Sequence, residues 1–425
     1  MPSLTVSFII GLPSILKQWL QLFISMLQED RIADEFDSLS AIRGVIDPWS
    51  IPLEEAPEDK EIPDPCAFRH ALHFMEMSPE EALEEYYALF EKPIDPDFAS
   101  AFPVVDLLKQ YSAVFVPTNW EGVNGVEDID LNWHEGLPEK QKPKARPINP
   151  KLWDNAKTEF TRLCKYFYRP SDSPVASCLV VAPKATKPFI RFCGDYATLI
   201  NRYISSGHPP IPDVRHSIDK IRGFPIYLDL DMANSFHQFR LAPKTSALLS
   251  IQTPWGQVEP MFLPEGIPPA SGILQKNAEN IFSGFEDWMI VIFDNLLVLA
   301  HNYEDAFDKL RKVLHRCLDR NLVLKFSKTW LGFRQVEFFG YLCQHNSYEL
   351  TTKRKDSISS WPFPESCKQA QRFLGSALFF RHFVPNYSSL SSELNELTKK
   401  GFSFDRTTWT KDYTVSFEKF KIALI

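Results

Sequence analysis

The stretch F-P-I-Y-L-D-L-D-M-A-N-S-F-H-Q, residues Phe224 to Gln238, decides the fold prediction. Between residues 226 and 230 the apolar side chains alternate, as they do in a strand that buries one face. Because strand side chains repeat every two residues, Asp229 and Asp231 share the opposite face. A carboxylate at the end of an apolar strand is costly to bury unless it binds something positive.

A second segment, D-W-M-I-V-I-F-D-N-L-L-V-L-A-H-N from Asp287 to Asn302, has a related pattern. Two apolar runs flank Asp294 and Asn295, which are favoured turn residues. The pattern predicts a hairpin with Asp294 at its tip. Taken alone, a plain Asp-Asn turn is the better explanation of the segment.

Together the two segments favour a functional site. Adjacent strands of one sheet would bring Asp231 and Asp294 together, and two close carboxylates repel unless cations lie between them. Hard oxygen ligands and a phosphate substrate suit Mg²⁺. Two such ions, ~3.5–4 Å apart, activate a hydroxyl and stabilise a leaving pyrophosphate.

The segments before these acids have simpler patterns. A helix is predicted from Trp153 to Tyr168, ended by the proline that follows. Two short strands, at residues 177–182 and 189–193, enclose a loop that carries Lys184 and Lys187. Such a hairpin suits a phosphate chain, although an exposed charged hairpin is the simpler interpretation.

Charge divides the 425-residue chain, whose length corresponds to roughly three domains. Residues 1–139 hold 7 basic and 27 acidic residues, whereas residues 140–425 hold 39 basic and 27 acidic residues. An acidic leader joined to a basic body is compatible with polyanion binding by the body. Basic residues that merely solvate surfaces would give the same balance.

The remaining composition excludes several classes of protein. The seven cysteines form no C-x-x-C pair, which argues against a disulfide framework or a zinc site and fits a reducing compartment. No apolar run reaches the ~20 residues that a membrane span needs.

The body resembles the reverse transcriptase of Gypsy-type LTR retrotransposons. Seven motifs occur in the family's order: R-P-S-D-S-P-V-A-S (169–177), R-F-C-G-D-Y-A-T-L-I-N (191–201), L-D-M-A-N-S-F-H-Q (230–238), L-P-E-G-I-P-P-A-S-G-I-L-Q (263–275), F-D-N-L-L-V (293–298), V-E-F-F-G-Y (336–341) and R-F-L-G-S-A-L-F-F-R-H-F-V-P-N-Y (372–387). Each motif is weak alone, but seven in order form a strong signal.

The resemblance implies an α+β right-hand polymerase of fingers, palm and thumb, with an acidic, partly extended N-terminal leader. It implies an RNA-directed DNA polymerase that uses two Mg²⁺ ions, or Mn²⁺, a primed RNA or DNA template and deoxynucleoside triphosphates. No membrane is expected, and the protein would work in the cytoplasm, the nucleus or virus-like particles. The sequence does not indicate an oligomeric state.

Roles for individual residues also come from the resemblance. Asp231 and Asp294 would bind the metals with the carbonyl of Met232, and Lys184 and Arg191 would hold the triphosphate. Phe236 would lie under the sugar, although an ordinary core ring is an alternative. Glu265 would lie in the nucleotide pocket, and Gln275 near the template or primer backbone. The primer 3′ end would be held by a grip of Val336, Glu337, Phe338, Phe339, Gly340 and Tyr341.

Two departures from the family bear on activity. Asn295 stands where the family has a second hairpin Asp, which removes one negative charge and predicts reduced activity or a changed metal preference. Glu265 stands where many relatives have Gln or Phe, so nucleotide handling is expected to differ.

The predicted domains follow the same resemblance. Residues 1–28 resemble the end of a retropepsin or form an amphipathic helix, and residues 29–139 are an acidic leader or linker. Fingers and palm are expected at 140–345, thumb and connection at 346–404, and a truncated RNase H-like start at 405–425. A polyprotein fragment that binds nucleic acid without catalysis is the alternative function.

Overall fold

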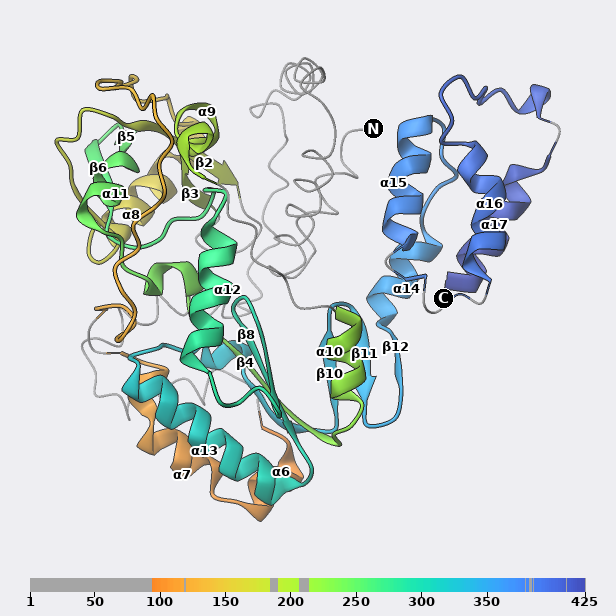
Figure 1. The fold of residues 1–425 in the computed structure, drawn as a ribbon, viewed down its shortest axis with the longest axis horizontal. Coiled ribbons are helices and arrows are strands. Elements are labelled where there is room, and N and C mark those ends of the chain that lie inside the picture. Colours follow the sequence, from red (N-terminus) through yellow and green to blue (C-terminus); the bar gives the residue numbers. More distant parts are fainter. Residues whose placement is uncertain are drawn as a thin grey trace. The chain divides into compact units, whose positions relative to one another are not determined.

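The computed structural model contains a four-stranded antiparallel sheet in the order β7-β8-β4-β9, of which Figure 1 labels β4 and β8. These strands are β4 (Ile226–Asp231), β7 (Met289–Ile292), β8 (Asn295–Ala300) and β9 (Trp330–Phe333). The predicted strand and the predicted hairpin are therefore confirmed. Leu228, Leu230 and Leu296 are fully buried, whereas the acids alternate with them along β4.

The structure describes residues 94–117, 120–183, 190–205, 214–378, 380–381, 384, 386–409 and 411–424. The predicted segment 1–28, most of the predicted leader, and Lys184 and Lys187 lie outside these residues. The chain forms two compact units, of which the first ends at Arg334 and the second begins at Gln335. No helix of the described residues is long and apolar enough to cross a membrane.

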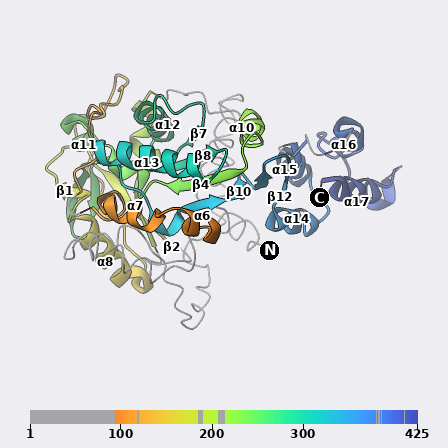
Figure 2. The same cartoon turned by 90° about the horizontal axis from the view of Figure 1, so that it is seen from below.

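Helix α13 (Tyr303–Asp319) covers the apolar face of this sheet by packing against β8 and β4 (Figure 2). Two short helices, α6 (Pro96–Ala101) and α7 (Val104–Gln110), join it through aromatic contacts. The ring of Phe98 stacks on Tyr303 with centroids 5.4 Å apart, and Phe102 stacks on Phe307 at 5.3 Å. Asp229 and Asp231 of β4 lie on the opposite face of the sheet.

A second, five-stranded sheet has the order β1-β6-β5-β2-β3. Its strands are β1 (Tyr168–Pro170), β2 (Ser177–Pro183), β3 (Ile190–Asp195), β5 (Ile251–Thr253) and β6 (Gly256–Pro260). Strands β2 and β3 pair antiparallel, as the sequence predicts. Helices α8 (Trp153–Leu163), α9 (Tyr196–Leu199) and α11 (Pro243–Leu248) pack on this sheet, whereas α12 (Ala270–Ile281) packs on β7 of the four-stranded sheet.

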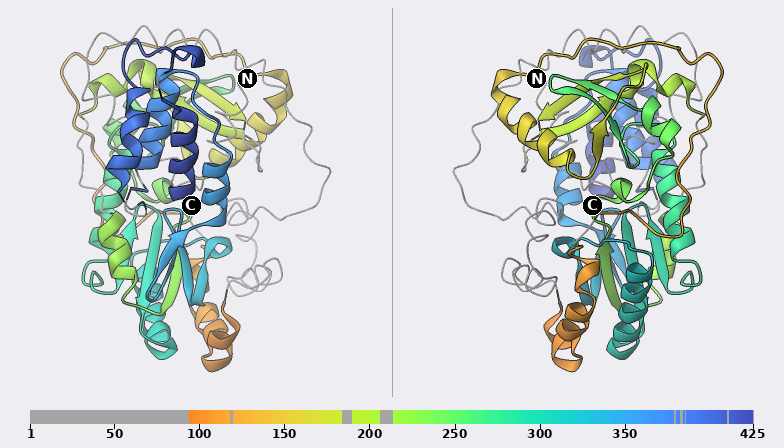
Figure 3. Two further views of the ribbon diagram at one scale, coloured as in Figure 1. Left: turned by 90° about the vertical axis from the view of Figure 1, so that its right-hand side faces the viewer. Right: turned by 90° about the vertical axis from the view of Figure 1, so that its left-hand side faces the viewer.

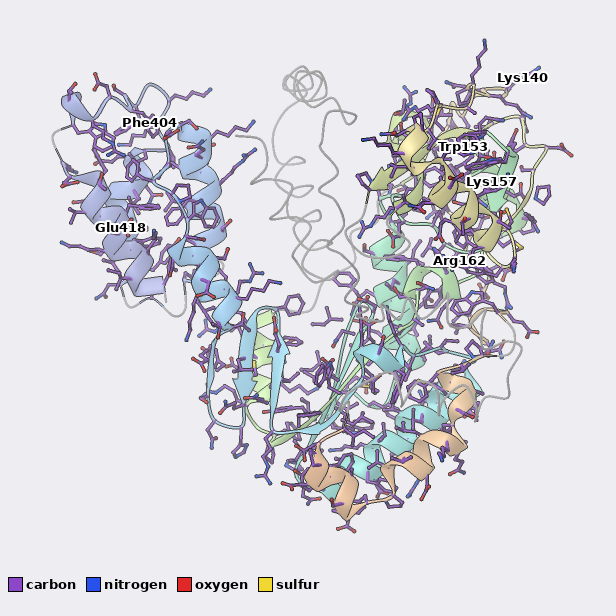
Figure 4. All side chains as sticks on the ribbon, turned by 180° about the vertical axis from the view of Figure 1, so that it is seen from behind. Lys140, Trp153, Lys157, Arg162, Phe404 and Glu418 are labelled. Carbon is purple, nitrogen blue, oxygen red and sulfur yellow. The ribbon has the colours of Figure 1, made fainter. Side chains whose placement is uncertain are left out.

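Helix α8 is shorter than predicted, because it ends at Leu163 rather than at Tyr168. Phe167 instead stacks on the His237 ring at 3.9 Å, and its carbonyl accepts a hydrogen bond from Met261. The aromatic periodicity therefore predicted a helix as far as Tyr168, whereas the two contacts of Phe167 hold that residue outside the helix. Figure 4 shows Trp153, Lys157 and Arg162 on α8, where Trp153 packs on Trp255 at 5.1 Å.

Among its described residues, the second unit has a three-stranded sheet and four α-helices. Their bounds are β10 (Gln335–Phe338), β11 (Tyr341–Gln344), β12 (Tyr348–Leu350), α14 (Thr352–Ser359), α15 (Cys367–Leu378), α16 (Tyr387–Glu396) and α17 (Tyr413–Leu424). The last three helices lie side by side in Figure 3. Phe373 and Phe417, with ring centroids 4.7 Å apart, lie in the core of this unit.

Short elements complete the described chain. They are α10 (Val214–Ile221) and the 3-10 turns η1 (Ser112–Val114), η2 (Pro150–Leu152), η3 (Asn201–Tyr203), η4 (Ser235–Gln238), η5 (Phe326–Lys328) and η6 (Arg406–Thr408).

Candidate active site

Asp231 and Asp294 meet at one end of the four-stranded sheet. Asp231 is the last residue of β4, and its Cα partner across the β4–β8 pair is Asn295. Asp294 lies in the turn between β7 and β8, and its carbonyl accepts a 2.7 Å hydrogen bond from the Met232 N–H. The two segments that the sequence singled out are therefore joined through their backbones.

The turn that carries Asp294 is braced from helix α12. Phe293 adopts a positive φ of 53°, and its N–H donates a 2.7 Å hydrogen bond to Oε1 of Gln275. The Gln275 amide donates in turn to the Val291 carbonyl at 2.9 Å and to Glu279 at 2.7 Å. Gln275 is only 1% exposed, so its side chain braces the turn from inside the protein, and its contact with the template or primer backbone stays a prediction.

Lys328 supplies a positive charge to these acids. Its Nζ lies 2.9 Å from Oδ2 of Asp231. Burial alone would lower the pKa of the Lys328 ammonium, but Asp231, Asp294 and Asp229 outweigh burial and raise the pKa above its usual value. The sequence analysis missed Lys328, because its partner lies 97 residues away and no local pattern marks the contact.

Burial makes both acids weak. Burial and then the charge of Asp231 raise the pKa of Asp294 to about 7, and Glu265 adds to this effect. Burial also raises the pKa of Asp231, although Lys328 opposes the shift. Such shifts are typical of buried carboxylates that share one site.

Asp229 belongs to the same group of charges. Its Oδ1 accepts a 2.7 Å hydrogen bond from the Asn295 amide. Burial raises the pKa of Asp229 to about 7, the Asn295 contact opposes this, and the charges of Asp231 and Asp294 add to it.

The donor set fits a divalent cation. Asp294 is 9% exposed, and its Oδ1 is buried and accepts no hydrogen bond from the described residues. An unpaired buried carboxylate oxygen is costly, and a hard cation would satisfy it. Within the described residues no three His, Cys, Asp or Glu side chains are grouped to hold a metal unaided, so further ligands would come from water or phosphate.

The residues expected around the nucleotide differ in their exposure to solvent. Arg191 is exposed on β3, and Phe236 is buried in η4 with 5% exposure. Glu265 is exposed, and its charge acts on both Asp294 and Cys193, while Arg191 acts on Cys193 too. Arg191 and Glu265 therefore both lie close enough to the Cys193 thiol for their charges to act on it. Lys184 lies outside the described residues.

The expected primer-grip residues form the β10–β11 hairpin of the second unit. Phe338 pairs with Tyr341, so the loop has two residues, and both of them have positive φ: 51° at Phe339 and 81° at Gly340. These angles define the twisted two-residue turn that suits a hairpin.

Sequence comparison finds relatives among transposon proteins, although no protein-family model matches the chain. The chain is 25% identical over 331 residues to the Transposon Tf2-7 polyprotein of Schizosaccharomyces pombe, which covers 75% of this chain and 24% of that protein. The Transposon Tf2-3 polyprotein gives the same identity and coverage. The chain thus spans about a quarter of the length of these curated relatives.

Among solved structures, the chain is similar to the foamy viral protease-reverse transcriptase. The complex with dsDNA gives a TM-score of 0.67 at 18% identity, covering 84% of this chain and 71% of that chain. The complex with RNA/DNA hybrid gives 0.64 at 17% identity, covering 84% and 46%.

The resemblance to a retrotransposon reverse transcriptase is confirmed. The predicted α+β right-hand fold is confirmed with it, since the likeness in structure extends over most of the chain. In this fold Asp231 lies at the end of β4 and Asp294 lies in the adjoining β7–β8 turn of the four-stranded sheet.

Proposed function

We propose that the chain is the RNA-directed DNA polymerase part of a retrotransposon polyprotein, and that it joins deoxynucleotides to a primer 3′-hydroxyl. The observation that carries the proposal is the meeting of Asp231 and Asp294, two nearly buried acids, around an unsatisfied carboxylate oxygen. The similar foamy viral structures are complexes with dsDNA and with an RNA/DNA hybrid, which supports a primed template as partner.

In this proposal Asp231, Asp294 and the carbonyl of Met232 would hold two divalent cations, Mg²⁺ or Mn²⁺. When bound, such ions supply Lewis acidity that makes the primer hydroxyl a better nucleophile and neutralises the leaving pyrophosphate. The protein's part is to hold both carboxylates in one fixed arrangement. The Met232–Asp294 backbone hydrogen bond and the Gln275 brace do this.

Residues outside the metal cluster would orient the substrates. Arg191 would hold the triphosphate by paired N–H donors, together with Lys184. Phe236 would lie under the sugar and exclude a 2′-hydroxyl. The β10–β11 hairpin would hold the primer end.

The domain assignment follows from these roles. Fingers and palm occupy residues 140–345, thumb and connection 346–404, and the start of an RNase H-like domain 405–425. The N-terminal part, 1–139, is assigned to a retropepsin end and an acidic leader. The protein would work in the cytoplasm, the nucleus or virus-like particles.

Primer extension tests the proposal. Purified protein with Mg²⁺, a DNA primer on an RNA template and deoxynucleoside triphosphates is expected to lengthen the primer. Asp231→Asn and Asp294→Asn should each remove this activity. The control is Asp308→Asn on α13, which should keep it, because Asp308 is exposed and forms an ion pair with Arg311 at 3.2 Å. No extension by the unaltered protein with either Mg²⁺ or Mn²⁺ would refute the proposal.

A second candidate function is nucleic-acid binding without catalysis, and Asn295 favours it because the site has one hairpin acid fewer. Thermal stabilisation separates the two. A polymerase should be stabilised by a deoxynucleoside triphosphate in the presence of primer–template and Mg²⁺, because a ligand that binds the native state raises the melting temperature. A pure binding protein should respond to primer–template but not to the nucleotide.

A further inference from the structure

A polar pair lies on the sheet face that carries Asp231. Asn295 is directly opposite Asp231 across the β4–β8 pair, and Asp229 precedes Asp231 by two residues on β4. Directly opposite residues share a face, and so do residues two apart on one strand. The Asn295 amide reaches diagonally across the pair and donates to Oδ1 of Asp229 at 2.7 Å.

The negative charge beside this face is not fully compensated. Asp294, in the adjoining turn, is 9% exposed, and its Oδ1 has no hydrogen-bond partner among the described residues. Lys328 reaches Asp231, with Nζ 2.9 Å from its Oδ2. The unsatisfied oxygen of Asp294 therefore indicates a cationic ligand at the end of β4.

We propose that Asp229 is a positioning residue of this site. Its carboxylate, on strand β4, supplies the third negative charge that position 295 lacks, and Asn295 holds Asp229 in place. The inference rests on the proposed function. Asp229 acts by its charge rather than as a ligand, because its Oδ1 is held by the Asn295 amide and a nearby cation favours the ionised carboxylate. The number of negative charges around a divalent cation sets its affinity.

The geometry makes Asp229 and Asn295 a matched pair. Asn295→Asp alone would replace the amide donor with a second carboxylate at hydrogen-bond distance from Asp229, where like charges repel. Exchanging the two residues keeps one donor, one acceptor and the same net charge. The single change therefore does not repair the site, whereas the exchange preserves it.

The experiment compares the unaltered protein with Asp229→Asn, Asn295→Asp and the exchange variant Asp229→Asn/Asn295→Asp. Asp308→Asn is the matched surface control. Mn²⁺ binding is measured by titration calorimetry without nucleotide, and the Mg²⁺ concentration for half-maximal primer extension is measured alongside. Asp229→Asn should weaken Mn²⁺ binding about 10-fold and raise the Mg²⁺ requirement, since one charge near the cation is lost.

The exchange variant should recover Mn²⁺ affinity to within about 3-fold of the unaltered protein, because the two changes are coupled. Unchanged affinity in Asp229→Asn, or an exchange variant no better than Asp229→Asn, would overturn the inference even if primer extension works. Absence of both Mn²⁺ binding and primer extension in the unaltered protein would instead overturn the proposed function. Should Asp229→Asn fold poorly, Asp229→Glu, which keeps the charge, must retain Mn²⁺ affinity for the inference to stand.

Discussion

The ammonium of Lys328 lies 2.9 Å from the Asp231 carboxylate, although the two residues are 97 positions apart. The side chain of Asp231 is 9% exposed and that of Lys328 is 43% exposed. A buried carboxylate therefore has a partly solvated cation as its counter-charge. A metal ion at the same carboxylate would meet the same electrostatic need.

Lys328→Met is expected to destabilise the metal-free protein by about 1–2 kcal/mol, since an exposed partner is partly screened but the acid left behind is buried. Added Mg²⁺ should reduce the difference, because the ion replaces the lost charge. Chemical denaturation with and without Mg²⁺ measures this. A loss of stability that is equal in both conditions would show that the ion does not bind near Asp231.

The raised pKa values predict a pH-dependent loss of stability. Asp294 has a pKa of about 7 in the folded protein, whereas an unfolded Asp titrates near pH 3.9. Between these values the folded state binds more protons, so the free energy of unfolding falls as pH rises. The decrease should be complete above about pH 7 in chelator.

Asp294→Asn removes this titration, so its free energy of unfolding should depend less on pH than that of the unaltered protein. Urea denaturation in chelator at several pH values between about 4 and 8 tests the difference. The variant is expected to be the more stable of the two at the alkaline end. Parallel curves for both proteins would contradict the burial argument.

The Gln275 brace predicts a variant that folds but works poorly. Gln275→Ala leaves the buried N–H of Phe293 without its acceptor, at a cost of about 1–3 kcal/mol, and frees the turn that carries Asp294. Primer extension should fall strongly while the melting temperature falls by only a few degrees. Gln275→Glu keeps the acceptor for Phe293 and should lose less activity; an inactive Glu variant beside an active Ala variant would refute the bracing role.

Local patterns predicted the elements that present the acids. Alternation between residues 226 and 230 marked β4, and the two apolar runs around Asp294 marked the β7–β8 hairpin, because strand periodicity is written into neighbouring residues. The nearness of Asp231 to Asp294 was expected if both strands shared a sheet, whereas the register that sets Asp231 opposite Asn295 was not predicted.

Contacts between distant segments could not be read in this way. The pairing of Lys328 with Asp231 and of Gln275 with Phe293 depends on packing between separate elements. The Asn295–Asp229 contact depends on strand register, which a single sequence does not specify. The predicted helix ran past Leu163 because the aromatic residues that follow continue its spacing, although Phe167 packs on His237 of η4 instead of extending the helix.

Phe236 offers a test of sugar selection. Its ring is 5% exposed in η4, five residues after Asp231 on the same connection. If this ring lies under the sugar, Phe236→Ala should raise the incorporation of ribonucleotides relative to deoxynucleotides by about 10-fold or more, because removal of a steric clash is worth at least ~1.4 kcal/mol. The ratio of kcat/KM for the two nucleotide types measures the effect. Phe236→Tyr keeps the ring and should retain discrimination, whereas equal ratios in the Ala variant and the unaltered protein would assign Phe236 to the core alone.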